Sequence, residues 1–309
     1  MGKWKILLVG SKGQIGWELN RTLQYLGDVF VINRETNLEF SDQSKIRSKI
    51  KDLNPNIIIN TVAVTDVENA GNDLLNTMYI NSQFPKLLAE ISNQLNILLV
   101  HFSTDSVFDG SSEKKYKEFD QPNPLNLYSH SKLEGERFIQ NNCNNYIIFR
   151  ITWIYSNRRK NFVTSILKKA HLNQDLHIVN DQWGSPSWAR CVAEVSTLAI
   201  KYFLTNNINK NKQIYINKIY HISSPDSTNW FNFTNLLISE YKEKIFKTRS
   251  IITPISIKDL PSKVNRPVRS ILDSSLLYND LNLSLPSWKS QVTLFIDDIF
   301  AFETQHFKF

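Results

Sequence analysis

Short apolar runs alternate with amphipathic segments through the first half of the chain. The runs are rich in Ile, Leu and Val, and the segments between them repeat apolar residues every three to four positions. The first pattern is typical of strands buried on both faces, and the second is typical of helices that pack on a sheet. The expected strands cover residues 5–9, 29–32, 57–60, 97–102 and 146–150, and the expected helices cover residues 15–25, 44–51, 75–94 and 129–140.

This alternation predicts an α/β fold with a Rossmann-type, doubly wound parallel sheet. We assign residues 1–155 to a dinucleotide-binding domain, and we expect segments near 172–182 and 217–223 to add strands to it. Beyond residue 155 the alternation loosens into helices, prolines and loops. We therefore assign residues 156–309 mainly to a smaller C-terminal substrate-binding lobe over the carboxyl ends of the strands, where ligands bind in open α/β sheets.

Composition narrows the class of protein. Of the 309 residues, 41% are hydrophobic and 21% charged, which is typical of a globular protein with a core. No run of about 18 apolar residues is present, and the apolar stretch after Met1 is too short for a signal peptide, so we expect no membrane partner. Cys143 and Cys191 lie far apart without metal-ligand spacing, which favours a reducing, cytoplasmic location.

The net charge of +7 could suit nucleic acid, an anionic membrane or an anionic small molecule. The basic residues are scattered, with short groups such as Arg158-Arg159-Lys160 and no run of five. We expect no nucleic-acid partner, and a small anionic ligand fits this pattern.

A glycine-rich segment follows the first expected strand and opens the first expected helix. Its spacing, GSKGQIG over residues 10–16, permits a tight turn, close approach of the backbone to a diphosphate, and a helix N-terminus directed at the negative charge. The segment after the third expected strand should line the same cofactor site. The candidate cofactor-binding residues from these two segments are Gly10, Lys12, Gly13, Gln14, Ile15, Gly16, Ala63 and Thr65.

The end of the second expected strand bears on the choice of cofactor. NAD sites usually place an acidic residue here to bind the ribose hydroxyls, whereas this chain has Asn33 followed by Arg34. An acid would repel a 2′-phosphate, and Arg attracts it. We expect NADPH to be preferred and NADH to be possible; the alternative is that Arg34 is a solvated surface residue.

Tyr128 and Lys132 are separated by four residues and therefore share one face of an expected helix. Of the 11 tyrosines, only Tyr128 has Lys at this spacing. An unperturbed Tyr has a pKa near 10, and a close ammonium would lower the pKa by favouring the phenolate. The pair predicts acid–base chemistry, with Tyr128 as proton donor to a keto oxygen. Both residues are also candidate cofactor contacts.

Hydroxyl groups at the end of the fourth expected strand complete the candidate site. Thr104, or Ser103 as second choice, would lie in the cleft and hydrogen-bond the keto oxygen against Tyr128. The glycine segment, the strand-end hydroxyls and the Tyr-x-x-x-Lys pair follow one another in the order expected of a nicotinamide-dependent reductase. We interpret His101 and His130 as structural residues.

Five segments resemble the dTDP-4-dehydrorhamnose reductases of the extended short-chain dehydrogenase/reductase superfamily. The similarity runs along almost the whole chain and is carried by residues 101–110 (HFSTDSVFDG), 122–136 (PNPLNLYSHSKLEGE), 150–155 (RITWIY), 179–186 (VNDQWGSP) and 266–273 (RPVRSILD). The resemblance implies NADPH-dependent reduction of the C4 keto group of dTDP-4-dehydrorhamnose to dTDP-L-rhamnose. It also implies that Thr104, Tyr128 and Lys132 are catalytic and that Lys132 contacts the nicotinamide ribose.

The same resemblance marks candidate substrate residues. Trp153 matches a residue that packs on the sugar, and Arg266 could bind the substrate diphosphate or form a structural ion pair. Ser106 departs from the tyrosine usual in these reductases, and the absence of a glutamate there argues against a dehydratase. The full set is Ser103, Thr104, Asp105, Ser106, Trp153 and Arg266.

The resemblance also bears on metal. Some of these reductases bind magnesium between subunits through glutamates, of which Glu18 keeps one, while Arg190 and Lys289 align with the others. Because cations repel Mg²⁺, we expect no metal, and we expect Arg190 or Lys289 to pair with Glu18.

Two alternatives stay open at this point. One is another nucleotide-sugar reductase or a 4-epimerase of the same superfamily. The other is a non-catalytic regulatory subunit on this fold, against which the intact Thr104, Tyr128 and Lys132 argue. We expect a monomer or a homodimer.

Overall fold

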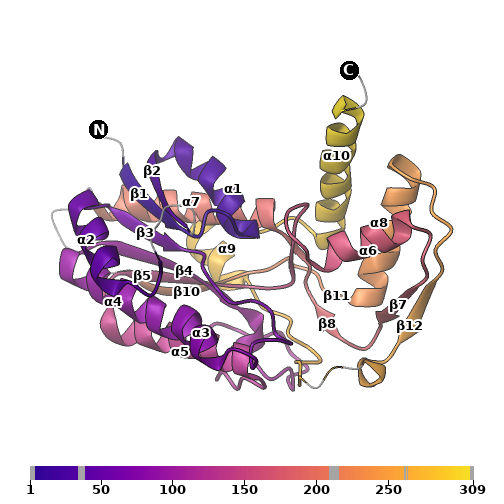
Figure 1. The fold of residues 1–309 in the computed structure, drawn as a ribbon, viewed down its shortest axis with the longest axis horizontal. Helices are drawn as coiled ribbons and strands as arrows, with labels where there is room; N and C mark the ends of the chain where they lie inside the picture. Colours follow the sequence, from indigo (N-terminus) through magenta and orange to yellow (C-terminus); the bar gives the residue numbers. More distant parts are fainter. Residues whose placement is uncertain (1–3, 34–38, 209–215, 261, 263, 307–309) are drawn as a thin grey trace.

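A six-stranded parallel sheet forms the centre of the protein (Figure 1). The computed structural model describes residues 4–33, 39–208, 216–260, 262 and 264–306. The strand order is β10-β5-β4-β3-β1-β2, so the chain reverses its direction of progress between β1 and β3, where ligands bind in such sheets. The strands are β1 (Trp4–Val9), β2 (Gly27–Ile32), β3 (Ile57–Asn60), β4 (Leu98–Thr104), β5 (Tyr146–Ile151) and β10 (Asn217–Ile222).

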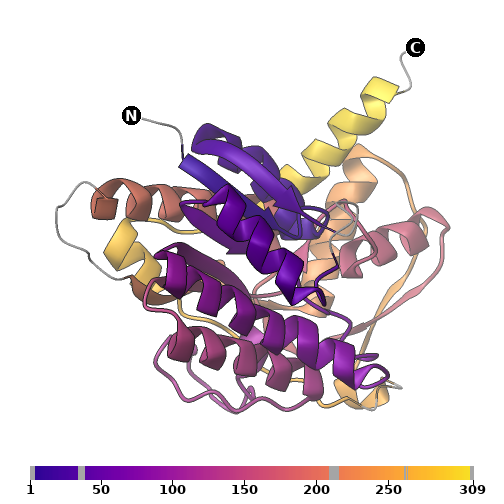
Figure 2. The same ribbon diagram turned by 60° about the vertical axis from the view of Figure 1, so that its left-hand side comes forward.

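Helices cover both faces of this sheet because successive strand residues point to opposite faces. Ile6 and Leu8 of β1 pack in the core beneath α1 (Gln14–Thr22) and α7 (Ala189–Ile208), whereas Leu7 and Val9 pack beneath α2 (Gln43–Leu53) and α4 (Phe84–Leu95). The turned view in Figure 2 shows the helices α2 and α4 lying along one face of the sheet. The predicted doubly wound α/β fold is confirmed. The helices of the two layers are α1 (Gln14–Thr22), η1 (Leu23–Tyr25) and α7 (Ala189–Ile208) on one face, and α2 (Gln43–Leu53), α3 (Leu74–Met78), the π-helical η3 (Tyr79–Gln83), α4 (Phe84–Leu95) and α5 (Leu127–Asn142) on the other.

The second lobe combines short strands with helices at the carboxyl ends of the central strands (Figure 1). Its three two-stranded sheets pair β6 with β9, β8 with β11, and β7 with β12. The elements are β6 (Ile154–Tyr155), α6 (Phe162–His171), β7 (Leu176–Val179), β8 (Trp183–Gly184), β9 (Ser187–Trp188), β11 (Thr228–Asn229), α8 (Trp230–Lys244), β12 (Ile252–Ile255), η5 (Ile257–Asp259) and α10 (Trp288–His306), with η4 (Asp105–Val107) and α9 (Ser275–Leu281) nearer the sheet.

The strand near 172–182 and helix α7 lie elsewhere than we expected, whereas the segment near 217–223 joins the central sheet as expected. The strand near 172–182 does not join the central sheet: β7 pairs with β12, and its exposed His177 shows that one face of β7 meets solvent. The segment near 217–223 supplies β10, at an edge of the central sheet. Conversely, α7 falls within the expected substrate lobe but packs on α1, where Thr22 and Thr197 share a 2.6 Å hydrogen bond. The boundary at residue 155 therefore does not fully separate the domain around the central sheet from the second lobe, because α7 and β10 follow residue 155 and belong to the first.

No helix in the described ranges combines the length and the apolar character that crossing a bilayer requires.

Candidate active site

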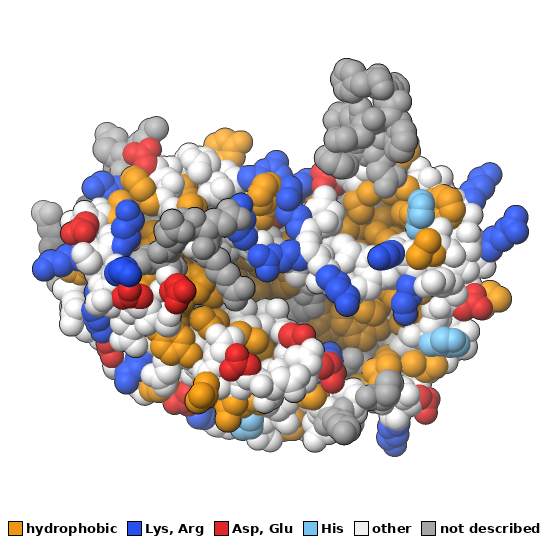
Figure 3. Space-filling view, in the orientation of Figure 1, with side chains coloured by type: hydrophobic (Ala, Val, Ile, Leu, Met, Phe, Trp, Pro, Cys, Tyr) orange, Lys and Arg blue, Asp and Glu red, His pale blue; other side chains and the backbone are white. Residues whose placement is uncertain are grey.

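A cleft of about 550 Å³ opens between the sheet and the second lobe. Figure 3 shows this face hollowed, with hydrophobic side chains along the hollow and Lys and Arg side chains above it. The cleft brings together most of the candidate residues, although they come from distant parts of the sequence. Those that line it are Gly13, Gln14, Ile15, Ala63, Thr65, Ser103, Thr104, Asp105, Ser106, Tyr128, Lys132, Trp153 and Arg266.

Four candidates lie outside the cleft lining, and one cannot be placed. Gly10 and Lys12 belong to the glycine turn, Gly16 lies in the first turn of α1, and Asn33 is buried, where its Nδ2 donates to Ser11 Oγ at 3.1 Å. Arg34, the candidate 2′-phosphate ligand, lies outside the described residues.

The glycine turn has the shape that a dinucleotide diphosphate requires. Gly10 has a φ of 97°, a conformation that side chains disfavour. A Cβ at Gly16 would lie 2.2 Å from the Gly10 carbonyl oxygen, so only glycine allows the helix to begin so close to the turn. Helix α1 then starts after Gly13 without a side-chain cap, which leaves its N-terminal amides for an anion. The residues present therefore fit the diphosphate of a nicotinamide dinucleotide.

A second segment, absent from our sequence candidates, fastens onto this turn. Arg159 Nε donates to the Lys12 carbonyl at 2.9 Å, and Asn161 Nδ2 donates to Gln14 Oε1 at 3.0 Å. Arg159, Lys160 and Asn161 all line the cleft. The only signal in the sequence is the short basic group at 158–160, and nothing in it indicates the contact with the glycine turn.

Tyr128 and Thr104 face each other in the cleft from the start of α5 and the end of β4. Asn126 caps α5 by accepting from the Ser129 amide, which starts the helix just before Tyr128. Burial raises the pKa of Tyr128 to about 12, while a hydrogen bond with Thr104 acts to lower that pKa and the charge of Asp105 to raise it. The phenol is therefore protonated at neutral pH and available as a proton donor.

Lys132 lies one turn further along α5 and is also buried. Its Nζ donates to the Phe102 carbonyl at 2.7 Å and lies 3.2 Å from His101 Nε2. Burial lowers the pKa of Lys132 to about 8, against the opposing charge of Glu136. We expected this ammonium to lower the pKa of Tyr128, but the structure shows the pKa of Tyr128 raised, because desolvation of the phenol dominates.

Ser103 and Asp105 are bound to other protein groups. The Ser103 hydroxyl donates to Glu136, which forms a buried ion pair with Arg150 at 2.7 Å. Asp105 accepts from Ser270 at 2.5 Å and from Thr152 at 3.0 Å, and burial raises its pKa. Of the two strand-end hydroxyls, Thr104 is therefore the one directed toward Tyr128.

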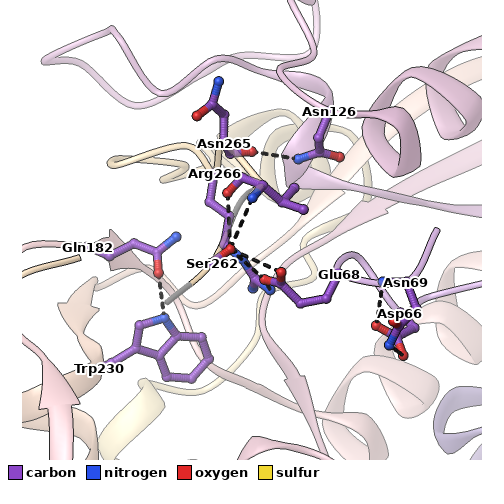
Figure 4. A network of polar contacts seen from close by, with 10 residues as sticks. Asp66, Glu68, Asn69, Asn126, Gln182, Trp230, Ser262, Asn265 and Arg266 are labelled. Atoms are coloured by element: carbon purple, nitrogen blue, oxygen red, sulfur yellow. Dashed lines mark hydrogen bonds and ion pairs between the residues drawn. The ribbon is translucent and has the colours of Figure 1, made fainter. Parts of the chain in front are cut away.

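An aromatic stack forms the wall of the cleft on the side of the second lobe. Trp153 and Trp230 lie parallel, with ring centroids 3.6 Å apart, and Trp230 Nε1 donates to Gln182 at 3.0 Å (Figure 4). Trp153 has a φ of 44°, which places it against Gly184. We did not identify Trp230 or Gln182 from the sequence, because their proximity to Trp153 arises only from packing.

Gly184 provides a test of this wall. A Cβ there would lie 2.4 Å from Trp153 Cε2, so Gly184→Ala should displace the indole. We expect the KM for the nucleotide-sugar substrate that the sequence resemblance implies to rise about tenfold, with the Kd for the nicotinamide cofactor unchanged. Steady-state kinetics measure this, with Gly71→Ala as control because a Cβ at Gly71 meets nothing within 4 Å. An unchanged KM in Gly184→Ala would show that Trp153 does not contact the sugar.

Arg266 also lines the cleft. Its Nη2 donates to Glu68 at 2.6 Å, and Ser262 donates to the same carboxylate at 2.9 Å (Figure 4). Asn126 Nδ2 donates to the Asn265 carbonyl at 2.9 Å. The segment around Arg266 is thus tied to both the loop after β3 and the start of α5, at the edge of the cleft.

Glu18 and Arg190, two of the three positions at which the resemblance raised the question of a metal, form an ion-pair cluster with Asp298. Arg190 Nε lies 3.5 Å from Glu18, and Arg190 Nη1 lies 2.7 Å from Asp298, so the expected pairing of Arg190 with Glu18 is confirmed. Lys289 lies over the Trp288 ring instead. Among the described residues, no group of three or more His, Cys, Asp or Glu side chains could hold a metal ion.

Comparison with known proteins gives relatives along the whole chain. A family profile described as the RmlD substrate binding domain matches residues 4–300. A dTDP-4-dehydrorhamnose reductase of Burkholderia thailandensis is 31% identical over 96% of this chain and 99% of its own length. The corresponding reductase of Salmonella typhimurium is 30% identical over 97% of this chain and 99% of its own length.

Solved structures give further relatives over nearly the whole chain. The dTDP-4-dehydrorhamnose reductase of Bacillus anthracis in complex with NADP is 26% identical, with a TM-score of 0.85 over 96% of this chain and 99% of that one. The UDP-glucose 4-epimerase of Thermotoga maritima, at 18% identity and a TM-score of 0.78 over 97% of this chain and 99% of that one, shares the fold. This chain belongs to the RmlD substrate binding domain family.

Proposed function

We propose that this chain reduces the C4 keto group of dTDP-4-dehydrorhamnose with NADPH, giving dTDP-L-rhamnose for polysaccharide biosynthesis. The observation that carries the proposal is the meeting of Thr104, Tyr128 and Lys132 with the glycine turn in one cleft. Relatives that align over nearly the full length are named for this reaction. The intact acid–base residues argue against a non-catalytic regulatory subunit.

The chain's residues would hold the cofactor along the floor of the cleft. The N-terminal amides of α1 and the backbone of the glycine turn would bind the diphosphate, and Ala63 and Thr65 would line the path toward the nicotinamide. When bound, NADPH supplies the hydride. Lys132 would approach the nicotinamide ribose from α5.

The proton would come from Tyr128. Its phenol is neutral at physiological pH and lies beside Thr104, so both hydroxyls can hydrogen-bond the keto oxygen. Tyr128 then donates its proton to the oxygen as negative charge develops there. Because Tyr128 and Thr104 are buried, their hydrogen bonds to the keto oxygen would be stronger than in water, which screens charge more than the protein interior does.

The substrate would lie between the cofactor and the second lobe. Trp153 would pack on an apolar face of the sugar, and Asp105 and Ser106 would lie beside its reacting end. Arg266 would exchange part of its pairing with Glu68 for the substrate diphosphate.

We place the enzyme in the cytoplasm as a monomer or homodimer. Both assignments are predictions, and the elution volume on a calibrated column tests the second.

NADPH should be the better cofactor. Asn33 occupies the position where an acid would repel a 2′-phosphate, and the family includes a reductase solved with NADP. We expect kcat/KM for NADPH to exceed that for NADH by about tenfold or more, the effect of about one charge-assisted contact. Initial rates with the two cofactors at equal ionic strength measure the ratio, and a value at or below one would contradict this preference.

The function itself is tested by NADPH oxidation with dTDP-4-dehydrorhamnose and NMR analysis of the product. We expect consumption of NADPH matched by formation of dTDP-L-rhamnose. A 4-epimerase would leave the NADPH concentration unchanged over many turnovers. A different 6-deoxysugar, or no reaction with this substrate, would contradict the proposal.

A further inference from the structure

A chain of buried polar groups runs behind the candidate catalytic lysine. It begins at Asn60, at the end of β3, passes through His101 in β4, and ends at Lys132 in α5. These three side chains belong to residues with exposed fractions of 1%, 1% and 2%. Asn60 Nδ2 lies 3.1 Å from His101 Nδ1, and His101 Nε2 lies 3.2 Å from Lys132 Nζ. In a dry site each of these contacts must match a donor with an acceptor.

The orientation of the Asn60 amide is set by the backbone. The amide N–H of Val62 donates to Asn60 Oδ1 at 3.1 Å. The Asn60 side-chain oxygen therefore faces the backbone just after β3, and its NH₂ group faces His101. An amide nitrogen can donate but cannot accept.

This orientation decides the tautomer of His101. Because Asn60 donates to Nδ1, Nδ1 must be unprotonated, and the single proton of a neutral imidazole must then be on Nε2. The ring is neutral because burial lowers the pKa of His101 well below its ordinary value, and the charge of Lys132 acts in the same direction. His101 therefore presents an N–H group to Lys132.

An N–H group suits only one protonation state of Lys132. An ammonium carries three donors and no lone pair, so it cannot accept from Nε2–H, whereas a neutral amine can. The amine can still donate to the Phe102 carbonyl at 2.7 Å. The hydrogen bonds around Nζ are thus complete when Lys132 is uncharged.

The charged groups near Lys132 do not reverse this preference. On its own helix, Glu136 favours the ammonium, but Glu136 is already paired with Arg150 of β5 at 2.7 Å and accepts from Ser103. Tyr128 is a neutral phenol, and Asp105 of η4 is held by Ser270, Thr152 and Thr104. His101 is the titratable group of β4 in direct contact with Nζ.

We propose that His101 is a positioning residue that favours the neutral amine of Lys132 in the free enzyme, and that Lys132 takes up a proton from solvent in mildly alkaline solution when the anionic dinucleotide binds. The negative charge of the cofactor then favours the ammonium, and its ribose hydroxyls offer acceptors that His101 does not. The ammonium so formed would face the phenolate left when Tyr128 has donated its proton. The inference rests on the proposed function only in placing Lys132 at the cofactor.

Proton uptake on cofactor binding provides one test. We would titrate NADPH into the whole protein at about pH 8.5 by calorimetry in two buffers of different ionisation enthalpy. We expect the wild type to take up about half a proton or more per NADPH bound. His101→Gln, whose amide oxygen can accept from an ammonium, should take up less than half of the wild-type amount. His130→Gln makes the same change at an exposed position of α5 and should match the wild type.

Asn60→Asp should change the tautomer of His101 while keeping the histidine itself. A carboxylate would accept from Nδ1–H, which moves the lone pair to Nε2 and lets His101 accept from the ammonium. This variant should also take up less than half of the wild-type amount. Equal proton uptake in the wild type and both variants, or none in the wild type, would overturn the proposal.

The tautomer can be read in the protein alone. In ¹⁵N-histidine-labelled protein, long-range ¹H–¹⁵N spectra should show His101, identified by its loss in His101→Gln, as the neutral Nε2–H form at about pH 8.5, where Lys132 is mainly uncharged. Asn60→Asp should convert the signal to the Nδ1–H form. A wild-type His101 found as Nδ1–H or as imidazolium would also overturn the proposal. This measurement needs no cofactor, so it distinguishes failure of the inference from failure of the proposed reaction.

Discussion

Tyr128→Phe is expected to lower kcat for NADPH oxidation with dTDP-4-dehydrorhamnose by about 10²-fold or more, the scale of general acid catalysis. The change removes one oxygen from a buried side chain whose phenol is protonated at neutral pH. The ring that packs at the start of α5 is kept, so the fold and the Kd for NADPH should change little. Initial rates at saturating substrate and a fluorescence titration of NADPH measure the two quantities.

Tyr116→Phe is the matched control. Tyr116 is also buried, and its hydroxyl donates to Asp109 at 2.8 Å outside the cleft lining. We expect the kcat of this variant to stay within about threefold of the wild type, since no hydrogen bond to substrate is lost. A Tyr128→Phe enzyme with kcat near that of Tyr116→Phe would remove Tyr128 from the proton-transfer step.

Arg150→Met is expected to lower the free energy of unfolding by about 3–5 kcal/mol. Arg150 and Glu136 lie 2.7 Å apart, with side chains only 3% and 1% exposed. Removing the guanidinium leaves the carboxylate buried without its partner charge, which costs more than the pair itself contributes. Urea unfolding followed by far-UV circular dichroism measures the change.

Two further variants distinguish the effect of the unpaired Glu136 carboxylate from the effect of lost packing. In the double variant Glu136→Gln/Arg150→Met no charge is left unpaired, so it should be more stable than Arg150→Met alone. Arg47→Met breaks the half-exposed pair with Glu90 and should cost only about 0–1 kcal/mol. If Arg150→Met cost no more than Arg47→Met, the ion pair between β5 and α5 would not support the site as we describe.

Local signals in the sequence were sufficient to predict the central fold. Residues 6–9 and 57–59 are apolar and buried at every position, and the GSKGQIG segment joins the first run to α1. The Tyr-x-x-x-Lys spacing places Tyr128 and Lys132 on one face of α5, whatever the surrounding structure. Each of these features depends on neighbours along the chain.

Features that depend on distant neighbours could not be predicted in this way. Trp230 stacks on Trp153 from a helix 77 positions later in the numbering, and Arg159 reaches the glycine turn from the start of the second lobe. The pKa of Tyr128 depends on how deeply the phenol is buried, which no spacing shows. His101 was interpreted as structural for the same reason, because its tautomer depends on Asn60 in a neighbouring strand.

We infer that hydride passes to the C4 keto carbon of the sugar in this cleft while Tyr128 protonates the oxygen. It is tested most directly by supplying NADPH deuterated at both C4 positions of the nicotinamide and analysing the sugar product by NMR. We predict dTDP-L-rhamnose carrying deuterium at C4 of the sugar, with the yield lost in Tyr128→Phe. A product without deuterium at that carbon, or one formed equally well by Tyr128→Phe, would contradict the account.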